Sequence, residues 1–281
     1  MYSAQITRQH KGAILLLLDL SGSMAERVVF EGRSMTKAQA LAEAVNSLIQ
    51  ECINRSRRER STADYFDIGI VGYAADEATS LLKNSWQSIV ALDNTPTPTQ
   101  SLRLRRTLPD GRSVETIVER RCWIEPEAKG RTPMGKAFQL ARRMCQSWCC
   151  KHPDSFPPIV INITDGEATD ATAEEIGALA QSLRSLSTND GNLLLMNIHL
   201  ASEHDTPTEP LRFPNEGTPL PNNRHAQLLY NISSPLPELY NTAIEELTHT
   251  PPPYRAICYN ASLDELVGLL AIGSLSMDRI I

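Results

Sequence analysis

Residues 12–24 read GAILLLLDLSGSM, and this stretch decides the fold. Residues 12–18 form a continuous aliphatic run, which is typical of a β-strand that is buried on both faces. Asp19 ends the run, and residues 21–23 (SGS) break it. A strand of this kind indicates a parallel sheet with helices on either side. Ligands bind such a sheet at the carboxyl ends of its strands, which is where this polar stretch falls.

Strands and helices are expected to alternate along the rest of the chain. The apolar patterns predict strands at residues 65–74, 159–164, 192–200 and 255–259, with a further short strand within 81–89. They predict helices from residue 36 to 53, at 132–150, 172–186 and 263–270, and in part of 227–247. Thr172 and Glu175 form a capping-box pattern at the start of one helix. The alternation predicts an α/β protein whose parallel sheet is covered by helices on both faces.

The length and composition are those of an ordinary globular protein. The chain has 281 residues, and 41% of them are hydrophobic, which excludes a disordered chain. No repeat and no clear linker divides it, so we expect a single domain over residues 1–281. We expect an inserted loop or hairpin at about 93–131, with a turn at Asp110-Gly111, and a Pro-rich surface loop at about 203–224.

Charge and cysteine content exclude further classes of protein. The 27 basic and 33 acidic residues give a net charge of −6, which argues against a general nucleic-acid-binding surface. No apolar run approaches the length of a membrane span. The apolar run after the first twelve residues is too short for a secretory signal. We therefore expect a cytoplasmic protein whose six cysteines are reduced thiols.

Oxygen-bearing side chains gather in three segments that lie far apart in sequence. The candidate metal-binding residues are Asp19, Ser21, Ser23, Thr132 and Asp165. Each segment follows a predicted strand or opens a predicted helix, so all three can meet at one edge of the sheet. Hydroxyl and carboxylate oxygens suit Mg²⁺, with Mn²⁺ or Ca²⁺ as alternatives, rather than zinc. Three neutral hydroxyls and two carboxylates leave such an ion under-neutralised, and Mg²⁺ commonly keeps waters among its six ligands, so a carboxylate from a partner can complete the shell.

The pattern Asp-x-Ser-x-Ser at residues 19–23, followed by Thr132 and by Asp165-Gly166, resembles the metal-ion-dependent adhesion site (MIDAS) of von Willebrand factor A (vWA) domains. The resemblance covers nearly the whole chain and is closest to the stand-alone intracellular bacterial type. It implies a Rossmann-like α/β fold, with a doubly wound, mostly parallel central sheet and helices on both faces. It also implies that the three hydroxyls bind the metal directly and that the two carboxylates act largely through water.

The resemblance implies a non-enzymatic, divalent-metal-dependent protein–protein interaction module that binds a Glu or Asp side chain of a partner through Mg²⁺. The implied setting is a bacterial regulatory or stress-response system, such as tellurite resistance, with a kinase, a phosphatase or an AAA+ ATPase as partner. The alternative is a non-ATPase subunit of a MoxR-type or chelatase-type AAA+ complex, because the chain lacks a phosphate-binding Gly-x-x-x-x-Gly-Lys-Ser/Thr motif.

Two other functions are less favoured. A metal-dependent phosphohydrolase would use Asp19 as nucleophile, but such chemistry normally has a second carboxylate two residues later, where Ser21 stands. The sequence also offers no lysine that can be placed beside these residues. A cell-surface adhesin would need an export signal. We therefore predict no catalytic residue.

Two weaker signals remain. The 93–131 insertion is rich in basic residues that could guide an acidic partner, although a mixed solvated surface is the alternative. These residues are Arg103, Arg105, Arg106, Arg112, Arg120, Arg121, Lys129 and Arg131. A second cluster consists of Cys145, Cys149, Cys150 and His152. It could bind zinc, but no second ligand pair has the usual spacing, so we interpret it as buried or unused thiols.

Overall fold

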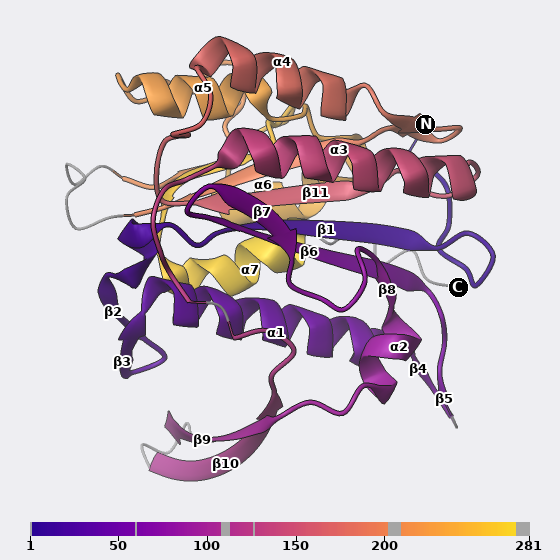
Figure 1. Cartoon of the computed structure of the whole chain (residues 1–281), viewed down its shortest axis with the longest axis vertical. Helices are drawn as coiled ribbons and strands as arrows, with labels where there is room; N and C mark the ends of the chain where they lie inside the picture. The colour runs from indigo at the N-terminus through magenta and orange to yellow at the C-terminus, as the bar shows by residue number, and fades with distance from the viewer. Residues whose placement is uncertain (1, 60, 108–112, 126, 202–208, 274–281) are drawn as a thin grey trace.

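The computed structural model describes the chain except for residues 1, 60, 108–112, 126, 202–208 and 274–281. Within the described residues, eight strands form the central sheet, in the order β15-β16-β14-β11-β1-β6-β7 with β8 beside β6 (Figure 1). The parallel strands are β1 (Gly12–Asp19), β6 (Phe66–Ala74), β11 (Ile159–Thr164), β14 (Leu194–Leu200) and β16 (Ile257–Ala261). The antiparallel edge strands are β7 (Glu77–Ser80), β8 (Gln87–Ser88) and β15 (Leu211–Arg212).

The direction in which strands are added reverses beside β1. The chain runs from β1 to β6 on one side, and then returns to β11, β14 and β16 on the other. This order confirms the predicted α/β class with a doubly wound, mostly parallel sheet. The reversal lies between β1 and β11, which is the position where open α/β sheets bind ligands. The carboxyl ends of these two strands carry Asp19 and, one residue beyond β11, Asp165.

Helices cover both faces of the sheet (Figure 1). One layer holds α1 (Lys37–Ser56), α2 (Ile89–Asn94), α6 (Asn241–Thr248) and α7 (Leu263–Gly273), and the other holds α3 (Met134–Lys151), α4 (Ala173–Arg184) and α5 (Arg224–Ile232). Strand β1 is buried throughout and serves both cores. Leu16 and its alternate neighbours face the first layer, whereas Leu15 and Leu17 face the second, as the two-residue period of a strand requires.

Several predicted elements agree with the structure. Strand β11 has the predicted bounds, and the predicted capping box is present, with Thr172 as the N-cap of α4 and Glu175 closing the reciprocal bond. Helix α1 follows Thr36 as expected, and Thr36 forms a second capping box with Gln39. Pro133 is the N-cap residue of α3.

Other predictions need correction. A strand within 81–89 is reduced to the two residues of β8, and the longer edge strand β7 comes earlier, after a turn in which Ala75 has a positive φ of 54°. The predicted strand at 192–200 is interrupted at Leu193, because β13 (Gly191–Asn192) pairs with β12 (Ser187–Thr188) and not with the central sheet. The first helix of the 227–247 region, α5, begins three residues early at Arg224. The short 3₁₀ helix η2 (Glu238–Tyr240) precedes α6.

Two small hairpins were absent from the sequence prediction. Strands β2 (Arg27–Phe30) and β3 (Arg33–Thr36) form the first, and β4 (Arg57–Arg58) and β5 (Ser61–Thr62) form the second. The β2–β3 turn has positive φ at both Glu31 and Gly32. This is the backbone of a tight hairpin turn, but Glu-Gly is not among the dipeptides that usually signal one.

The 93–131 region contains an antiparallel hairpin of β9 (Thr99–Thr107) and β10 (Ser113–Arg121), and the Asp110-Gly111 turn lies outside the described residues. Figure 1 shows the hairpin beyond α1, on the far side from the sheet. Arg120 fastens it to α1 through Glu43, at 2.9 Å, and Arg121 donates to Asp93 and to nearby carbonyls. These two arginines therefore hold the hairpin in place.

Part of the 203–224 loop also lies outside the described residues, and its later portion contains β15, which pairs with β16. In the part of the chain that the structure describes, no helix has the length and apolar composition needed to cross a bilayer.

Candidate metal site at the carboxyl edge of the sheet

Asp19, the last residue of β1, has no exposed surface. Its Oδ1 accepts a hydrogen bond from the Ser21 amide (2.9 Å), and its Oδ2 accepts one from the Thr164 hydroxyl (2.6 Å). Burial raises the pKa of the Asp19 carboxyl to about 6, although these hydrogen bonds favour the ionised form. A buried carboxyl with this pKa costs free energy as an anion, which a nearby cation would offset.

Ser21, Ser23 and Asp165 form a continuous chain of hydrogen bonds. The two serine hydroxyls lie 3.1 Å apart, and the Ser23 hydroxyl donates to Asp165 Oδ1 at 2.6 Å. Since Ser23 has a single hydroxyl proton, Ser21 is the donor in the first contact. Ser21 and Asp165 are buried, whereas Ser23 is exposed, so solvent reaches the group at Ser23. The chain links residues that are 142 positions apart in sequence.

Thr132 lies in the segment that packs against the first loop. The amide of Gly22 donates to the carbonyl of Gly130 (2.9 Å), and the Thr132 amide donates to the Thr169 hydroxyl (3.0 Å). Gly130 has a positive φ of 68°, and a Cβ there would come within 2.7 Å of the Ala75 backbone, so only glycine fits this position. The structure thus brings all three predicted segments to one edge, where Thr132 is buried and its carbonyl accepts a hydrogen bond from the Thr169 amide (3.0 Å).

The donor atoms suit a hard divalent cation. Neighbouring ligands of an octahedral Mg²⁺ with bonds of about 2.1 Å stand about 3 Å apart. The Ser21–Ser23 oxygen separation already has this value. Among the described residues, no three His, Cys, Asp or Glu side chains form a metal-binding group.

Lys37 is a residue of this site that the sequence analysis missed. It is the first residue of α1, and it is only 2% exposed. Its ammonium donates to Asp165 Oδ2 at 3.3 Å and forms an ion pair with Glu26. A lysine in the first turn of a helix is unfavourable, because its charge opposes the helix dipole. This position in the sequence was the signal that another interaction holds Lys37 there.

The next strand, β14, carries His199 beside an aromatic cluster. The His199 ring stacks on Tyr259 at 4.2 Å, and the His225 ring meets it edge-on at 5.4 Å. Burial, with contributions from His225 and Lys37, lowers the pKa of His199 to about 3. His199 is therefore neutral near pH 7, and its Nδ1 accepts a hydrogen bond from the Asn260 amide.

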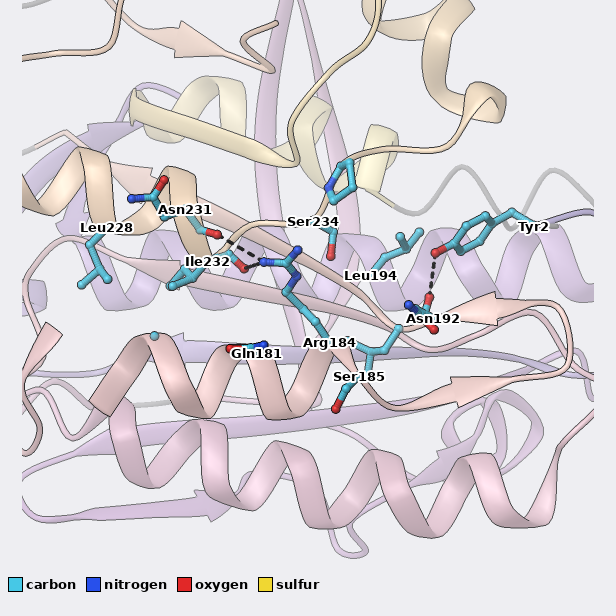
Figure 2. Close-up of a pocket in the computed structure, with 13 residues that line it drawn as sticks. Tyr2, Gln181, Arg184, Ser185, Asn192, Leu194, Leu228, Asn231, Ile232 and Ser234 are labelled. Atoms are coloured by element: carbon cyan, nitrogen blue, oxygen red, sulfur yellow. Dashed lines mark hydrogen bonds between the residues drawn. The ribbon is translucent and has the colours of Figure 1, made fainter. Parts of the chain in front are cut away.

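A hollow lies at the opposite edge of the sheet, where β14 begins (Figure 2). Its volume is about 690 Å³, and it lies between the ends of α4 and α5. Arg184 points into it, but its Nη1 donates to the carbonyls of Asn231 and Ile232 at the end of α5. Burial lowers the pKa of Arg184. The arginine thus caps a helix, and none of the candidate metal-binding residues lines this hollow.

The cysteine cluster lies on α3. Cys145 and Cys149 are buried and Cys150 is exposed, and all three are unpaired thiols. Burial raises the pKa of Cys149 to about 11, and it raises that of Cys145 as well. The His152 ring stacks on the Trp148 ring, with centroids 4.6 Å apart. A thiol with a raised pKa is a poor metal ligand near neutral pH.

No protein-family model matches this chain, and a search of curated proteins gave no match. Solved structures do resemble it. One is a von Willebrand factor type A protein from Catenulispora acidiphila, at 16% identity and a TM-score of 0.42, over 68% of this chain and 34% of that one. Another is proximal thread matrix protein 1 from the mussel byssus, at 15% identity and 0.44, over 98% and 47%.

A third is the vWF domain of the type V pilus tip protein Mfa5 from Porphyromonas gingivalis, at 9% identity and a TM-score of 0.42, over 96% of this chain and 95% of that one. The chain corresponds to about a third and about half of the length of the first two proteins. Because each TM-score is below 0.5, the assignment of the fold class rests on the strand order and helix layers of this chain.

Proposed function

We propose that this chain is a vWA-type, divalent-metal-dependent protein-binding module. Asp19, Ser21, Ser23, Thr132 and Asp165 hold one Mg²⁺, with Mn²⁺ or Ca²⁺ as alternatives, and an Asp or Glu side chain of a partner protein completes the shell. The supporting observation is the hydrogen-bonded chain of Ser21, Ser23 and Asp165, which spans the reversal point between β1 and β11. The metal supplies the positive charge that attracts the partner's carboxylate.

The proposed module is a binding protein and not an enzyme. A phosphohydrolase would need Asp19 to attack its substrate. Both oxygens of Asp19 accept hydrogen bonds, and the residue has no exposed surface. The lysine near the site, Lys37, contacts Asp165 and Glu26 rather than the would-be nucleophile. These contacts suit an anchored carboxylate that supports a metal.

We extend the proposal to the setting and the partner. The resemblance to stand-alone bacterial vWA proteins favours a regulatory or stress-response role of the tellurite-resistance type, with a kinase, a phosphatase or an AAA+ ATPase as partner. None of the six cysteines forms a disulfide bond, which fits a reducing compartment such as the cytoplasm. Lys129 and Arg131 are exposed on either side of Gly130, where they would attract an acidic partner.

Titration calorimetry with Mg²⁺ tests the proposal. We expect wild-type protein to bind one ion, Asp19→Asn and Thr132→Ala to lose at least about 100-fold in affinity, and Ser182→Ala to bind like wild type. The last variant removes a hydroxyl on α4, away from the site, and serves as the matched control. Circular dichroism verifies that each variant is folded. Equal affinity in wild type and the two site variants contradicts the assignment.

Affinity purification from the source organism then addresses the partner. Tagged wild-type protein should retain the partner in Mg²⁺ and release it in EDTA, and Thr132→Ala should retain none. An AAA+ ATPase in the eluate favours the alternative role, as a non-ATPase subunit of a MoxR-type or chelatase-type complex. Retention of the same partner in EDTA contradicts a metal-bridged contact.

A further inference from the structure

The buried lysine beside the candidate site is unusual. Lysine is rarely buried unless its charge is paired, and Lys37 is 2% exposed. Its two acidic partners come from different segments, because Glu26 directly follows the 3₁₀ helix η1 (Gly22–Ala25) and Asp165 follows β11. The Lys37 amide also donates to the Glu26 carbonyl, at 2.9 Å. Lys37 therefore ties the first loop of the site to the third.

The contacts of Asp165 show which group the charge of Lys37 acts on. Oδ1 accepts from the Ser23 hydroxyl at 2.6 Å, and Oδ2 accepts from the Lys37 ammonium at 3.3 Å. The side chain of Asp165 has no exposed surface, so solvent screens this ion pair weakly. A carboxylate that supports a divalent cation is thus already in contact with a cation that belongs to the protein.

Two cations near one carboxylate repel each other. At a few ångströms, and away from bulk water, this repulsion is large enough to alter an affinity by an order of magnitude. Glu26 acts in the opposite direction, because it shares the ammonium with Asp165 and adds negative charge near the site. The way in which the Lys37 ammonium is shared between Glu26 and Asp165 therefore affects the affinity of the site for a metal.

We propose that Lys37 is a built-in counter-cation that stabilises the metal-free form of the site and limits its affinity for divalent metal. This inference rests on the proposed metal site. It predicts that removing the charge of Lys37 strengthens metal binding, whereas a lysine that merely positions Asp165 for the metal would weaken binding when removed. The sign of the change in affinity separates the two roles.

The test is calorimetric titration of Mg²⁺, repeated with Mn²⁺ and detected by electron paramagnetic resonance. We expect Lys37→Met to bind about tenfold or more tightly. Glu26→Gln should bind several-fold more weakly, because Lys37 then interacts with Asp165 alone. The matched control is Lys151→Met, the same substitution at an exposed lysine at the C-terminal end of α3, which should change affinity less than about twofold.

Thermal denaturation provides a second readout. In EDTA, Lys37→Met should melt below wild type, since Asp165 is left buried without its cation, and Mg²⁺ should raise the melting temperature of this variant more than that of wild type. If Lys37→Met does not fold even in Mg²⁺, the double variant Glu26→Gln/Lys37→Met is compared with Glu26→Gln: tighter binding by the double variant supports the inference, and equal or weaker binding overturns it.

The outcomes distinguish the inference from the proposed function. If wild type binds metal and folded Lys37→Met binds equally or more weakly, the counter-cation role is wrong and the metal site stands. If neither wild type nor Lys37→Met binds Mg²⁺ or Mn²⁺, both are wrong.

Discussion

The carboxyl edge and the amino edge of the sheet differ in how their polar groups are used. At the carboxyl edge, Asp19, Ser21 and Asp165 are buried. Hydrogen bonds to their side chains, which are not part of the strand pairing, connect the residues of this edge. At the amino edge, a hollow of about 690 Å³ is open, but its arginine, Arg184, is bonded to helix carbonyls. The proposed site therefore does not coincide with this hollow, and lies instead among buried oxygen donors that are hydrogen-bonded to one another.

The largest effect on stability should come from the buried hydroxyl of Thr164. It donates to Asp19 Oδ2 and accepts from the Gly166 amide, so Thr164→Val leaves a buried carboxylate oxygen and an amide without their partner. We expect a loss of about 2–3 kcal/mol in the free energy of unfolding. Urea denaturation in EDTA measures it. A loss below about 0.5 kcal/mol would show that the carboxyl edge tolerates buried polar groups without hydrogen-bond partners. It would contradict the view that this edge depends on its mutually bonded polar groups.

The second-largest effect should be a loss of stability at acidic pH that is caused by His199, near the carboxyl edge. The pKa of His199 is lowered to about 3 in the folded protein, so between this value and about 6.5 the unfolded chain binds the extra proton. The contribution of His199 to stability is therefore present above pH 6.5 and is lost as the pH falls, at up to about 1.4 kcal/mol per pH unit.

His199→Phe keeps a ring against Tyr259 and removes this titration. Urea denaturation in EDTA at pH 7, 6 and 5 should show the stability difference between wild type and variant shift in favour of the variant as the pH falls. A difference that is constant across this range would contradict the burial of a neutral His199.

These results also bear on what the sequence can predict. Local patterns predict strands β1 and β11 and the N-terminal cap of helix α4. Aliphatic runs indicate the two strands, and the Thr-x-x-Glu capping box indicates where the helix begins. The meeting of the three segments that carry the five candidate residues also follows, because the carboxyl ends of parallel strands share an edge.

Lys37 could not be placed by the same reasoning. Its partner Asp165 is 128 residues away, and only the packed fold brings the two together. The β2–β3 hairpin depends on a Glu31-Gly32 turn with weak turn chemistry, and β15 depends on pairing with β16 at the sheet edge. Tertiary contacts decide such elements, so local propensity alone misses them.

The smallest effect should come from the amino edge. Arg184→Met removes two bonds to the end of α5 but keeps the aliphatic stem, so we expect a loss of about 1 kcal/mol in unfolding free energy. Mg²⁺ affinity should remain within about twofold of wild type, as calorimetry can determine. A loss of metal binding in this variant would mean that the two edges are coupled.

The central claim is that three distant segments hold one divalent cation with a coordination position left for a partner. A crystal structure grown with Mn²⁺, with anomalous diffraction recorded, tests it most directly. We predict a single strong anomalous peak in contact with the hydroxyls of Ser21, Ser23 and Thr132, with at least one position filled by solvent or by an acidic group of a neighbouring molecule. A map with no peak at these residues, or a metal fully enclosed by the chain's own side chains, would contradict the account.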